Sequence, residues 1–507
     1  MSDTSIISDK TTDLKKLCDT VLSEHRLIIV SNRGPVQFRP NKNGDMEAKH
    51  SSSGVVTALD LLTQISKPTW ISSAMGEGDR NIARSDTAGT VESPLQQHNM
   101  RLRYIAHPRS MYHKYFNILC NPTIWFLQHY MWNGPYSPNV DQTVYDAWHN
   151  GYVPVNQAFA QAVLQEAEGS SVEPVIMIHD YHLYLTAGYV RKSLPNAVIQ
   201  HFNHIPWPTP RYWQLIPYYI RKDICSSLCS ADVVAFQTPS DVHNFLNTCE
   251  EVLPDNKVDY VANAVYWNGR VTKVRAYPVS INVSEIRDMA RSNRSLEYYG
   301  NLKSLCKDKT IVRIDRAEPS KNIIRGFRAY RALLSKHPEL CGKVTFLAFL
   351  VPSRTHIRQY QRYMTELQQE VDDINSAFGD DQWQPIVPFF ENNYIQAISA
   401  MKLYDVLLAN PVIDGMNLVV KEGAVVNAKG GVVILSESSG AYPELREGVL
   451  PVSPSDTEGT QDAIYRALTM SMEQRRSLAN ILRQTVENQD INHWLYQQFH
   501  GLTDLSL

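Results

Sequence analysis

Two basic residues five positions apart, Arg316 and Lys321, flank a turn with the sequence Ala-Glu-Pro-Ser. The turn leads into an amphipathic stretch over residues 323–334, so the pattern predicts two cations beside the N-terminus of a helix. Such a site suits a diphosphate, because the cations and the helix dipole would stabilise a nucleoside diphosphate as a leaving group. Taken alone, the spacing is explained more simply by a solvated helix start with ordinary surface charges.

A second polar run begins at Asp414 with the sequence Asp-Gly-Met-Asn-Leu, and Glu422 follows eight residues later. The run is typical of a loop that feeds a helix N-terminus. Two carboxylates at this spacing could bind the hydroxyls of a sugar and a ribose through charge-assisted hydrogen bonds. The alternative is an ordinary helix start, with Asp414 as the cap and Glu422 solvated.

A third polar group contains His179, Asp180 and His182, and His204 follows in a Pro-Trp-Pro context. We do not expect a metal here, because His-x-x-His after a strand lacks the helical spacing of a metal site and has no third ligand nearby in sequence. His204 could equally be a packed, hydrogen-bonded histidine. The sequence has no G-x-S-x-G run, which disfavours a Ser-His-Asp hydrolase.

Each of these groups follows a short apolar run, and such runs alternate with amphipathic helical stretches along the chain. The runs show little period-2 alternation, which predicts buried parallel strands in an α/β fold. Ligands bind such folds beyond the carboxyl ends of the strands, where the polar residues lie. The expected strands are 27–30, 175–178, 198–202, 233–236, 310–314, 344–350, 406–409 and 432–435, and two expected helices are 323–334 and 361–375.

A chain of 507 residues exceeds what one hydrophobic core supports, so two domains are expected. The apolar runs form two groups, with a hinge expected around residues 278–283. The predicted organisation is a polar extension over 1–25, an N-terminal domain over 26–278, a C-terminal domain over 279–485 and a last segment over 486–507.

Composition excludes several classes of partner. Lys and Arg (49) nearly balance Asp and Glu (52), so neither nucleic acid nor an anionic membrane is an expected partner. No apolar run approaches the length of a membrane span, and the polar N-terminus does not resemble a signal peptide. Seven scattered cysteines indicate reduced thiols, and we expect a cytoplasmic protein in which Cys225 and Cys229 are a buried apolar pair.

In this order and spacing, the polar groups resemble the trehalose-6-phosphate synthase family of retaining glycosyltransferases, from about Arg26 to about Trp494. Late segments around residues 467–471 and 490–494 fit the same family. The residues that carry the resemblance are Ser31-Asn32-Arg33, His179-Asp180-Tyr181-His182-Leu183, His204-Ile205-Pro206-Trp207-Pro208, Arg316 with Lys321, Arg354, and Asp414-Gly415-Met416-Asn417-Leu418-Val419 with Lys421-Glu422.

The resemblance implies the GT-B architecture, in which two Rossmann-like domains with parallel sheets face each other across a cleft and a final helix crosses back to the first domain. It implies a nucleotide-sugar donor, a phosphorylated small-molecule acceptor, and neither a cofactor nor a metal. A general base is not assigned. The implied catalytic residues are Asp180, His204, Arg316, Lys321 and Asp414; the implied donor-binding residues are Gly54, Arg316, Lys321, Asp414, Met416, Asn417, Leu418, Val419 and Glu422; the implied acceptor-binding residues are Arg33, Trp125, Asp180 and Arg354.

The chain departs from the family pattern at several positions. The family usually reads Arg-Leu-Asp-Tyr-Ser-Lys-Gly where this chain has Arg-Ala-Glu-Pro-Ser-Lys-Asn from Arg316, and it carries Arg where this chain has Ile413. A Gly-Gly pair that closes on the donor corresponds to Ser53-Gly54, and a pocket tyrosine aligns nearest Phe116, beside Tyr115. The nucleotide base and the acceptor are therefore open.

The leading hypothesis is synthesis of α,α-trehalose 6-phosphate from a UDP-, GDP- or ADP-glucose and glucose 6-phosphate. The alternatives are a glucosylglycerol-phosphate synthase, a validoxylamine-type pseudoglycosyltransferase, and a catalytically silent regulatory subunit that binds sugar phosphate. Silence is disfavoured because a scaffold would not need two unpaired cations, Arg316 and Lys321, facing a cleft. The sequence leaves the oligomeric state open, and a homo-oligomer is one option.

Overall fold

The computed structural model describes residues 3–41, 46–51, 54–85, 89–95, 98–132, 139–168, 172–355 and 357–505. The chain divides into two compact units. Unit 1 comprises Met1–Val279 with Asn492–Leu507, and unit 2 comprises Ser280–Ile491. The two crossings between units therefore fall after Val279 and after Ile491. The first lies within the stretch 278–283, where the hinge is expected, and the second lies within the last segment, 486–507.

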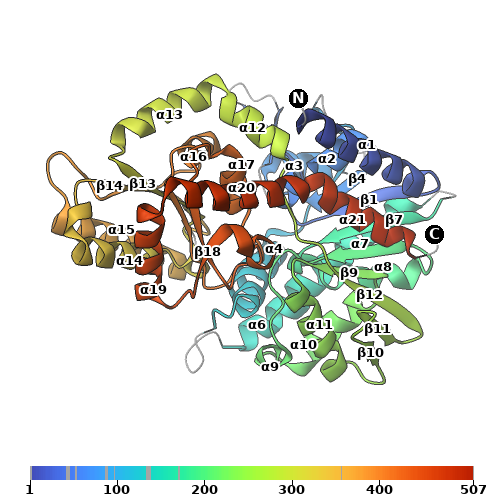
Figure 1. The fold of residues 1–507 in the computed structure, drawn as a ribbon. Helices are drawn as coiled ribbons and strands as arrows, with labels where there is room; N and C mark the ends of the chain where they lie inside the picture. Colours follow the sequence, from blue (N-terminus) through green and yellow to red (C-terminus); the bar gives the residue numbers. More distant parts are fainter. Residues whose placement is uncertain are drawn as a thin grey trace. The chain divides into compact units, whose positions relative to one another are not determined.

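Unit 1 is built on a mostly parallel sheet with helices around it (Figure 1). In the part of the chain that the structure describes, the sheet runs in the order β10-β11-β12-β9-β8-β7-β1-β4-β6-β5. Its strands are β1 (Arg26–Val30), β4 (Thr69–Ser73), β5 (Thr90–Glu92), β6 (Arg101–Ile105), β7 (Pro174–His179), β8 (Val198–Phe202), β9 (Val233–Phe236), β10 (Lys257–Asp259), β11 (Ala264–Trp267) and β12 (Arg270–Ala276), and β2 (Val36–Pro40) pairs with β3 (Met46–His50) as a separate hairpin.

The helices of unit 1 include two π-helical stretches, η1 and η2, and a short 3₁₀ turn, η3. They are α1 (Asp3–Leu22), α2 (Gly54–Ile65), α3 (Glu77–Ala83), α4 (Arg109–His113), η1 (Lys114–Trp125), α5 (Phe126–Gln128), α6 (Gln142–Ala147), η2 (Trp148–Tyr152), α7 (Val153–Ala167), η3 (Tyr181–Leu183), α8 (Thr186–Ser193), α9 (Pro210–Trp213), α10 (Tyr218–Leu228), α11 (Pro239–Val252) and α21 (Ile491–Thr503).

The order of the parallel strands in unit 1 reverses between β1 and β7. From this point the chain builds outward through β4 and β6 on one side and through β8, β9 and β12 on the other. A crevice forms at such a switch point because the loops after the two central strands turn in opposite directions. The loop after β1 carries Arg33, and the loop after β7 carries Asp180.

The last helix, α21, lies beside the first helix, α1, although they come from opposite ends of the chain (Figure 1). The Thr11 hydroxyl donates to Asn492 Oδ1 at 3.0 Å. The buried Trp494 donates its indole N–H to the carbonyl of Tyr277 at 3.0 Å, and Gln200 of β8 donates to Gln498 at 2.7 Å. These contacts fix the returning segment against the sheet of unit 1.

Unit 2 is a six-stranded sheet within the described residues, and every adjacent pair of strands is parallel. The order is β15-β14-β13-β16-β17-β18, which is the 3-2-1-4-5-6 order of dinucleotide-binding sheets. The strands are β13 (Lys309–Arg316), β14 (Val344–Val351), β15 (Ile386–Phe389), β16 (Val406–Ala409), β17 (Val432–Ser436) and β18 (Val449–Val452).

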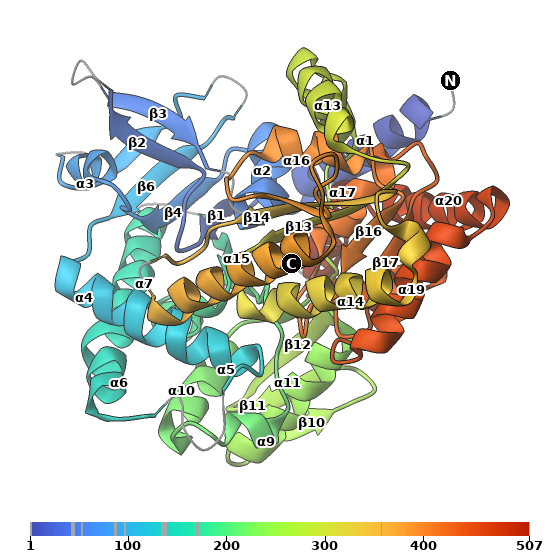
Figure 2. The same ribbon diagram turned by 90° about the vertical axis from the view of Figure 1, so that its left-hand side faces the viewer.

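Helices cover this sheet, and Figure 2 shows α14 and α15 lying side by side over it. The backbone N–H of Ile323, the first residue of α14, donates to the Tyr363 hydroxyl of α15 at 3.1 Å. The helices are α12 (Val283–Arg291), α13 (Asn293–Leu305), η4 (Pro319–Lys321), α14 (Ile323–Lys336), η5 (Pro338–Leu340), α15 (Arg358–Phe378), α16 (Tyr394–Met401), α17 (Leu418–Val426), α18 (Tyr442–Leu445), η6 (Arg446–Gly448), α19 (Thr457–Thr469) and α20 (Met472–Asn488).

All eight expected strands are present, as are both expected helices. The continuous apolar runs were readable because parallel strands are buried on both faces. Among the strands that the sequence did not reveal, β6, β10 and β12 carry charged residues, as in Arg101–Ile105, whereas β4 is buried throughout but contains Thr and Ser. Cys225 and Cys229 are buried as expected, and the Cys229 and Cys249 sulfurs lie 3.7 Å apart.

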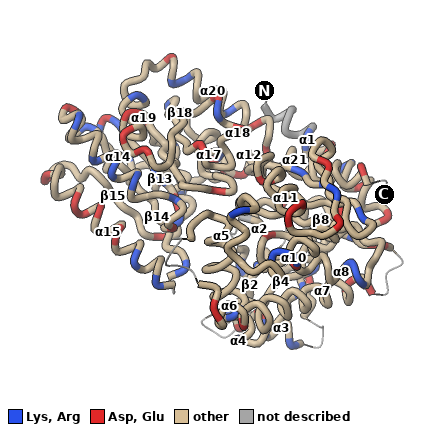
Figure 3. Tube along the Cα trace, turned by 90° about the horizontal axis from the view of Figure 1, so that it is seen from below, with Lys and Arg blue, Asp and Glu red and all other residues tan. Residues whose placement is uncertain are grey.

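Acidic and basic residues are interspersed along the trace of both units rather than gathered by sign (Figure 3). Among the described residues, no helix is both long and apolar enough to span a bilayer.

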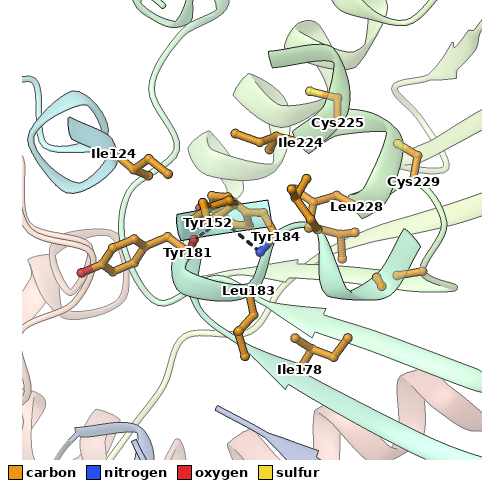
Figure 4. Close-up of a cluster of buried hydrophobic side chains, with 14 of the residues drawn as sticks. Ile124, Tyr152, Ile178, Tyr181, Leu183, Tyr184, Ile224, Cys225, Leu228 and Cys229 are labelled. Atoms are coloured by element: carbon orange, nitrogen blue, oxygen red, sulfur yellow. Dashed lines mark hydrogen bonds between the residues drawn. The ribbon is translucent and has the colours of Figure 1, made fainter. Parts of the chain in front are cut away.

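Tyr152 holds the turn after β7 from inside the core of unit 1 (Figure 4). Its hydroxyl donates to the carbonyl of Tyr181 at 2.7 Å and accepts from the backbone N–H of Tyr184 at 3.2 Å. All three tyrosines are buried, so these backbone groups have no access to water. The hydroxyl therefore fixes the backbone directly after Asp180.

Tyr152→Phe should lower the free energy of unfolding of unit 1 by about 1–3 kcal/mol, because it removes the hydroxyl that bonds a buried N–H and a buried C=O. Urea unfolding followed by tryptophan fluorescence measures the change. Tyr218→Phe is the matched control, since the Tyr218 hydroxyl also donates to a carbonyl, that of Val252 at 2.9 Å, but its side chain is exposed. Equal effects of the two variants would contradict the assigned role.

Candidate functional site

The turn after β13 has the predicted form of a short Pro-containing segment that opens a helix. Pro319 begins η4, Asn322 adopts the left-handed conformation with φ 59°, and α14 starts at Ile323. Asn tolerates this conformation better than most residues. The Asn322 amide donates to the carbonyls of Asn410 and Pro454 at 2.9 and 2.7 Å, so the turn is tied to the loop after β16.

Arg313, a buried residue of β13, fixes the backbone at Lys321. Its guanidinium donates to Asn410 Oδ1 at 2.6 Å and also to the backbone carbonyl of Lys321. Gly326 of α14 gives the guanidinium its space, because a Cβ at this position would lie 2.4 Å from Arg313 Nη1. The strand, the helix and the loop after β16 thus hold one another at the switch point between β13 and β16.

Lys321 and Asp414 form an ion pair across this switch point. Lys321 Nζ lies 2.5 Å from Asp414 Oδ2, and the two side chains are 12% and 13% exposed. The Asn417 amide donates to the same oxygen at 3.3 Å. The loop of Asp414 is closely packed, since a Cβ on Gly440 would lie only 1.8 Å from the carbonyl oxygen of Gly415.

The run after Asp414 feeds α17, as predicted. Asn417 caps this helix, because its side-chain oxygen accepts from the backbone N–H of Val420 at 3.2 Å. Asp414 is not the cap and Glu422 is not solvated, so the alternative of an ordinary helix start is wrong. Met416 is buried, and Leu418 and Val419 form the first turn of α17.

Glu422 is buried, and its carboxylate accepts from the Tyr394 hydroxyl of α16 at 2.7 Å. Burial raises the pKa of Glu422 to about 7, and the hydrogen bond from Tyr394 opposes part of this rise. The neighbouring Lys421 is fully buried and pairs with Glu444 at 2.6 Å. Glu422 therefore has a neutral hydroxyl as its partner, whereas Lys421 has a carboxylate.

Arg316 and Arg354 meet on the buried carboxylate of Glu318. Arg316 Nη1 lies 3.1 Å and Arg354 Nη1 3.0 Å from Glu318 Oε1, and the Ser353 hydroxyl donates to it at 2.7 Å. Burial alone would raise the pKa of Glu318, but the two guanidiniums and the hydroxyl hold it at about 2. Arg354 also bonds the Tyr360 hydroxyl at 2.6 Å.

One premise of the sequence interpretation is wrong: Arg316 and Lys321 are not unpaired. Their partners, Glu318 and Asp414, could not be inferred from spacing, because Asp414 is 93 residues from Lys321 and Glu318 read as a turn residue. Arg316 remains 55% exposed, so its guanidinium can still meet a ligand from solvent.

Asp180 follows β7 in a strained conformation with φ 77°. Its Oδ2 lies 3.5 Å from His182 Nδ1, whereas its buried Oδ1 has no hydrogen-bond partner among the described residues. Burial alone would raise the pKa of Asp180, but His182 and His204 hold it at about 2. An ionised oxygen without a partner is suited to accept from a ligand hydroxyl.

His204 packs against His179, with 3.2 Å between His204 Nε2 and His179 Nδ1. Burial lowers the pKa of His204 to about 4, so the ring is neutral near pH 7. A neutral imidazole offers one donor and one acceptor. Both the packed and the ligand-binding interpretation of His204 thus agree with its surroundings.

Arg33 is exposed, whereas the preceding Ser31 and Asn32 are buried. The Trp70 indole donates to the Ser31 hydroxyl at 2.8 Å, and the Ser31 hydroxyl donates to the carbonyl of Arg33 at 2.7 Å. Tyr115 donates to Asn32 Oδ1 at 3.3 Å. Ser31 and Asn32 therefore position the backbone from which Arg33 extends.

The structure also describes two further expected residues, Trp125 and Gly54. Trp125 is buried at the end of η1 and stacks on His129 with 3.9 Å between ring centroids. Ser53 lies outside the described residues, and Gly54 is the first residue of α2. The Phe116 ring stacks nearly parallel on His182, with centroids 5.8 Å apart. The Tyr115 ring is tilted relative to the same histidine.

A separate cavity of about 760 Å³ lies in unit 1. It contains none of the predicted site residues and is lined mainly by α3, the end of β6 and α7. We look for the chemistry at the strand switch points instead, because ligands bind parallel α/β sheets beyond the carboxyl ends of the strands at such points.

A comparison with known proteins identifies the class to which these two α/β units belong. The chain is a glycosyltransferase of the GT-B fold class. It belongs to glycosyltransferase family 20, whose family model matches residues 25–504.

Its relatives include UDP-forming α,α-trehalose-phosphate synthases. One from Pichia angusta is 31% identical over 483 residues, which cover 92% of this chain and 97% of the relative. One from Dictyostelium discoideum is 28% identical, and the match covers 92% of this chain but only 61% of the relative's length.

Among solved structures, an E. coli trehalose-6-phosphate structure bound with UDP-2-fluoro glucose superposes with a TM-score of 0.80 at 26% identity, covering 94% of this chain and 98% of the other. A Burkholderia xenovorans synthase in complex with glucose-6-phosphate gives a TM-score of 0.80 at 25% identity and coverages of 94% and 100%.

Glu422→Gln should flatten part of the pH dependence of stability. The pKa of Glu422 in the folded protein is about 7, above its usual value of 4.5. Between about pH 4.5 and 7, the folded protein therefore keeps a proton on Glu422 that the unfolded chain has released. The stabilising contribution is complete below about pH 4.5 and is lost as pH rises through 7. Relative to the variant, the wild type should lose up to about 3 kcal/mol between pH 4.5 and 7.5.

Urea unfolding at a series of pH values measures this difference. The exposed Glu366 of α15 provides the control, because Glu366→Gln should leave the pH profile unchanged. Parallel profiles for wild type and Glu422→Gln would show that Glu422 ionises normally.

Proposed function

We propose that this protein makes α,α-trehalose 6-phosphate by transferring glucose from a nucleotide-glucose to glucose 6-phosphate with retention of anomeric configuration. The observation that carries the proposal is the Lys321–Asp414 pair at the switch point of unit 2. It presents a cation for a diphosphate next to a carboxylate for hexose hydroxyls, on a sheet whose strand order is that of nucleotide-binding domains. The Pichia and Dictyostelium relatives are named for this synthesis.

In the proposed donor site, Lys321 and Arg316 neutralise the diphosphate as charge develops on the leaving group. Asp414 holds the hexose, the backbone of 416–419 at the start of α17 contacts sugar and phosphate, and Glu422 binds the ribose. Arrival of the donor would exchange the Lys321–Asp414 contact for two contacts with ligand, so neither charge loses its compensation. Gly54 belongs to the segment that would close on the bound donor.

In the proposed acceptor site, Arg33 and Arg354 bind the phosphate and Trp125 shapes the pocket. The unsatisfied Oδ1 of Asp180 accepts from a sugar hydroxyl, and the neutral His204 orients the reacting sugar. The acceptor hydroxyl attacks on the face from which the diphosphate leaves, and a departing phosphate oxygen takes its proton. The protein contributes positioning and electrostatics, and no side chain is assigned as general base.

We also propose a cytoplasmic location, which the scattered buried thiols support. A homo-oligomer is a further option, and light scattering of the purified protein would decide it.

The reaction itself is tested by nucleotide release with UDP-, GDP- and ADP-glucose, each offered glucose 6-phosphate or glycerol 3-phosphate. The proposal predicts release with glucose 6-phosphate and a doubly α-linked product by NMR couplings. Release with glycerol 3-phosphate alone would replace it with a glucosylglycerol-phosphate synthase. Silence with every pair would favour the validoxylamine-type or regulatory alternative, which the Glu-Pro and Asn322 departures keep open.

Lys321→Ala should lower kcat by about 10²–10³-fold and raise the donor KM, because the leaving diphosphate loses its closest cation. Steady-state kinetics with the active donor measure both constants. Lys343→Ala, which removes an exposed lysine of the same unit, should change neither constant. Near-normal kinetics of Lys321→Ala would remove this residue from the donor site.

Arg354→Ala should raise the KM for glucose 6-phosphate by about tenfold to hundredfold, the loss expected for a charge-assisted hydrogen bond of about 1.5–3 kcal/mol. Because Arg354 also braces Glu318, donor affinity is measured separately by calorimetry. The exposed Arg358 supplies the control variant, Arg358→Ala. An unchanged acceptor KM would exclude Arg354 from acceptor binding.

A further inference from the structure

Three side chains of unit 1 that the glycosyltransferase site does not use converge on one point. His50 ends β3, Asp60 lies on α2, and His98 lies in the loop before β6. Asp60 Oδ1 is 3.1 Å from His50 Nε2 and 3.2 Å from His98 Nδ1. In the described part of the chain, this is the one group of three or more His, Cys, Asp or Glu whose ligand atoms all lie within 4.8 Å of one another.

Hydrogen bonds hold the backbone at His50 and beside His98, and Asp60 lies within α2. His50 pairs with Val36 in the β2–β3 hairpin, and the next residue, Ser51, donates its N–H to the Pro35 carbonyl at 2.8 Å. Asn99, next to His98, donates its N–H to the carbonyl of Thr63 on α2 at 2.9 Å. The convergence therefore does not depend on long, freely moving side chains.

We infer that His50, Asp60 and His98 form a binding site for a late first-row divalent cation, with Zn²⁺ as the best fit. Two imidazoles and one carboxylate are the protein ligands of many open zinc sites, and they leave the fourth position to water. Bonds of about 2.0–2.1 Å in a tetrahedron place neighbouring ligand atoms about 3.3–3.4 Å apart. The two nitrogen–oxygen separations here need to lengthen by only a few tenths of an ångström.

The ligand types also decide the class of ion. Imidazole nitrogen suits Zn²⁺, Ni²⁺, Co²⁺ and Cu²⁺, whereas Mg²⁺ and Ca²⁺ prefer sets of oxygen ligands. Thr63 donates its hydroxyl to the Asp60 carbonyl at 2.7 Å, so its oxygen accepts from a protonated His98 Nδ1 at 2.8 Å. The ion would replace this proton and neutralise the shared Asp60 carboxylate.

An ion at this position would join three segments of unit 1 through one set of ligand bonds. It would connect the end of β3 to α2 across the short stretch 51–54, and both of these to the loop before β6. Binding to the folded but not the unfolded state should therefore raise the melting temperature of the protein in a manner that saturates with ion concentration. This consequence is independent of transferase activity.

The test is titration of the metal-free full-length protein with Zn²⁺ by calorimetry and with Co²⁺ by visible absorption. It is performed with Cys306→Ser and Cys341→Ser in place, because these two thiols are partly exposed and could bind the same ions. We expect one equivalent of each ion, a tetrahedral Co²⁺ spectrum without a thiolate band, and a rise in melting temperature with Zn²⁺.

His98→Ala and His50→Ala should each weaken Zn²⁺ binding by more than about 100-fold and abolish the Co²⁺ spectrum. His243→Ala removes an exposed histidine of α11 and should leave both signals intact. Circular dichroism establishes that each variant is folded. Absence of Zn²⁺ binding below millimolar concentration, or binding that survives both ligand substitutions, would overturn the inference and leave a hydrogen-bonded His-Asp-His cluster.

Discussion

The Lys321–Asp414 ion pair is the contact around which the switch point of unit 2 is organised. It joins a loop after β13 to a loop after β16, and the buried Arg313 fixes the same two loops from within the sheet. With both side chains only about one-eighth exposed, neither charge is well solvated, and each is compensated chiefly by the other. Such a pair contributes little net stability, but removing one partner alone is costly. A ligand that brings a negative diphosphate and a row of hydroxyls can replace both partners at once.

The Glu318 carboxylate likewise compensates nearby cations, because it forms ion pairs with both Arg316 and Arg354. These two arginines were assigned to different substrates, the donor diphosphate and the acceptor phosphate, yet they share one buried anion. A ligand that draws one guanidinium away leaves the other more strongly bound to Glu318. With the proposed roles of Arg316 and Arg354, the two substrates would be coupled through the Glu318 carboxylate, which contacts neither of them.

The fold could be predicted largely from the sequence, because buried parallel strands are continuous apolar runs and polar residues at their carboxyl ends mark the switch points. Asp180 in unit 1, and Lys321 and Asp414 in unit 2, were found in this way, whereas Arg33 entered through the family resemblance. What the sequence concealed were partners distant along the chain. Lys321 and Arg316 were expected to be unpaired and are not. Glu422 was not expected to be protonated near neutral pH, because its burial beneath Tyr394 has no local sequence signal. The His50, Asp60 and His98 cluster was missed since its members come from three separate elements.

The central claim is that the Lys321–Asp414 pair is a donor site whose charges exchange partners on binding. Calorimetric titration of UDP into the wild type and Asp414→Asn tests it most directly, because UDP carries the diphosphate but no hexose. The account predicts that Asp414→Asn binds UDP at least as tightly as the wild type, since Lys321 no longer has to leave a carboxylate, while turnover of the nucleotide-glucose collapses. If Asp414→Asn lost UDP binding while remaining folded, Asp414 would serve the diphosphate or the loop rather than the hexose, and the exchange would be contradicted.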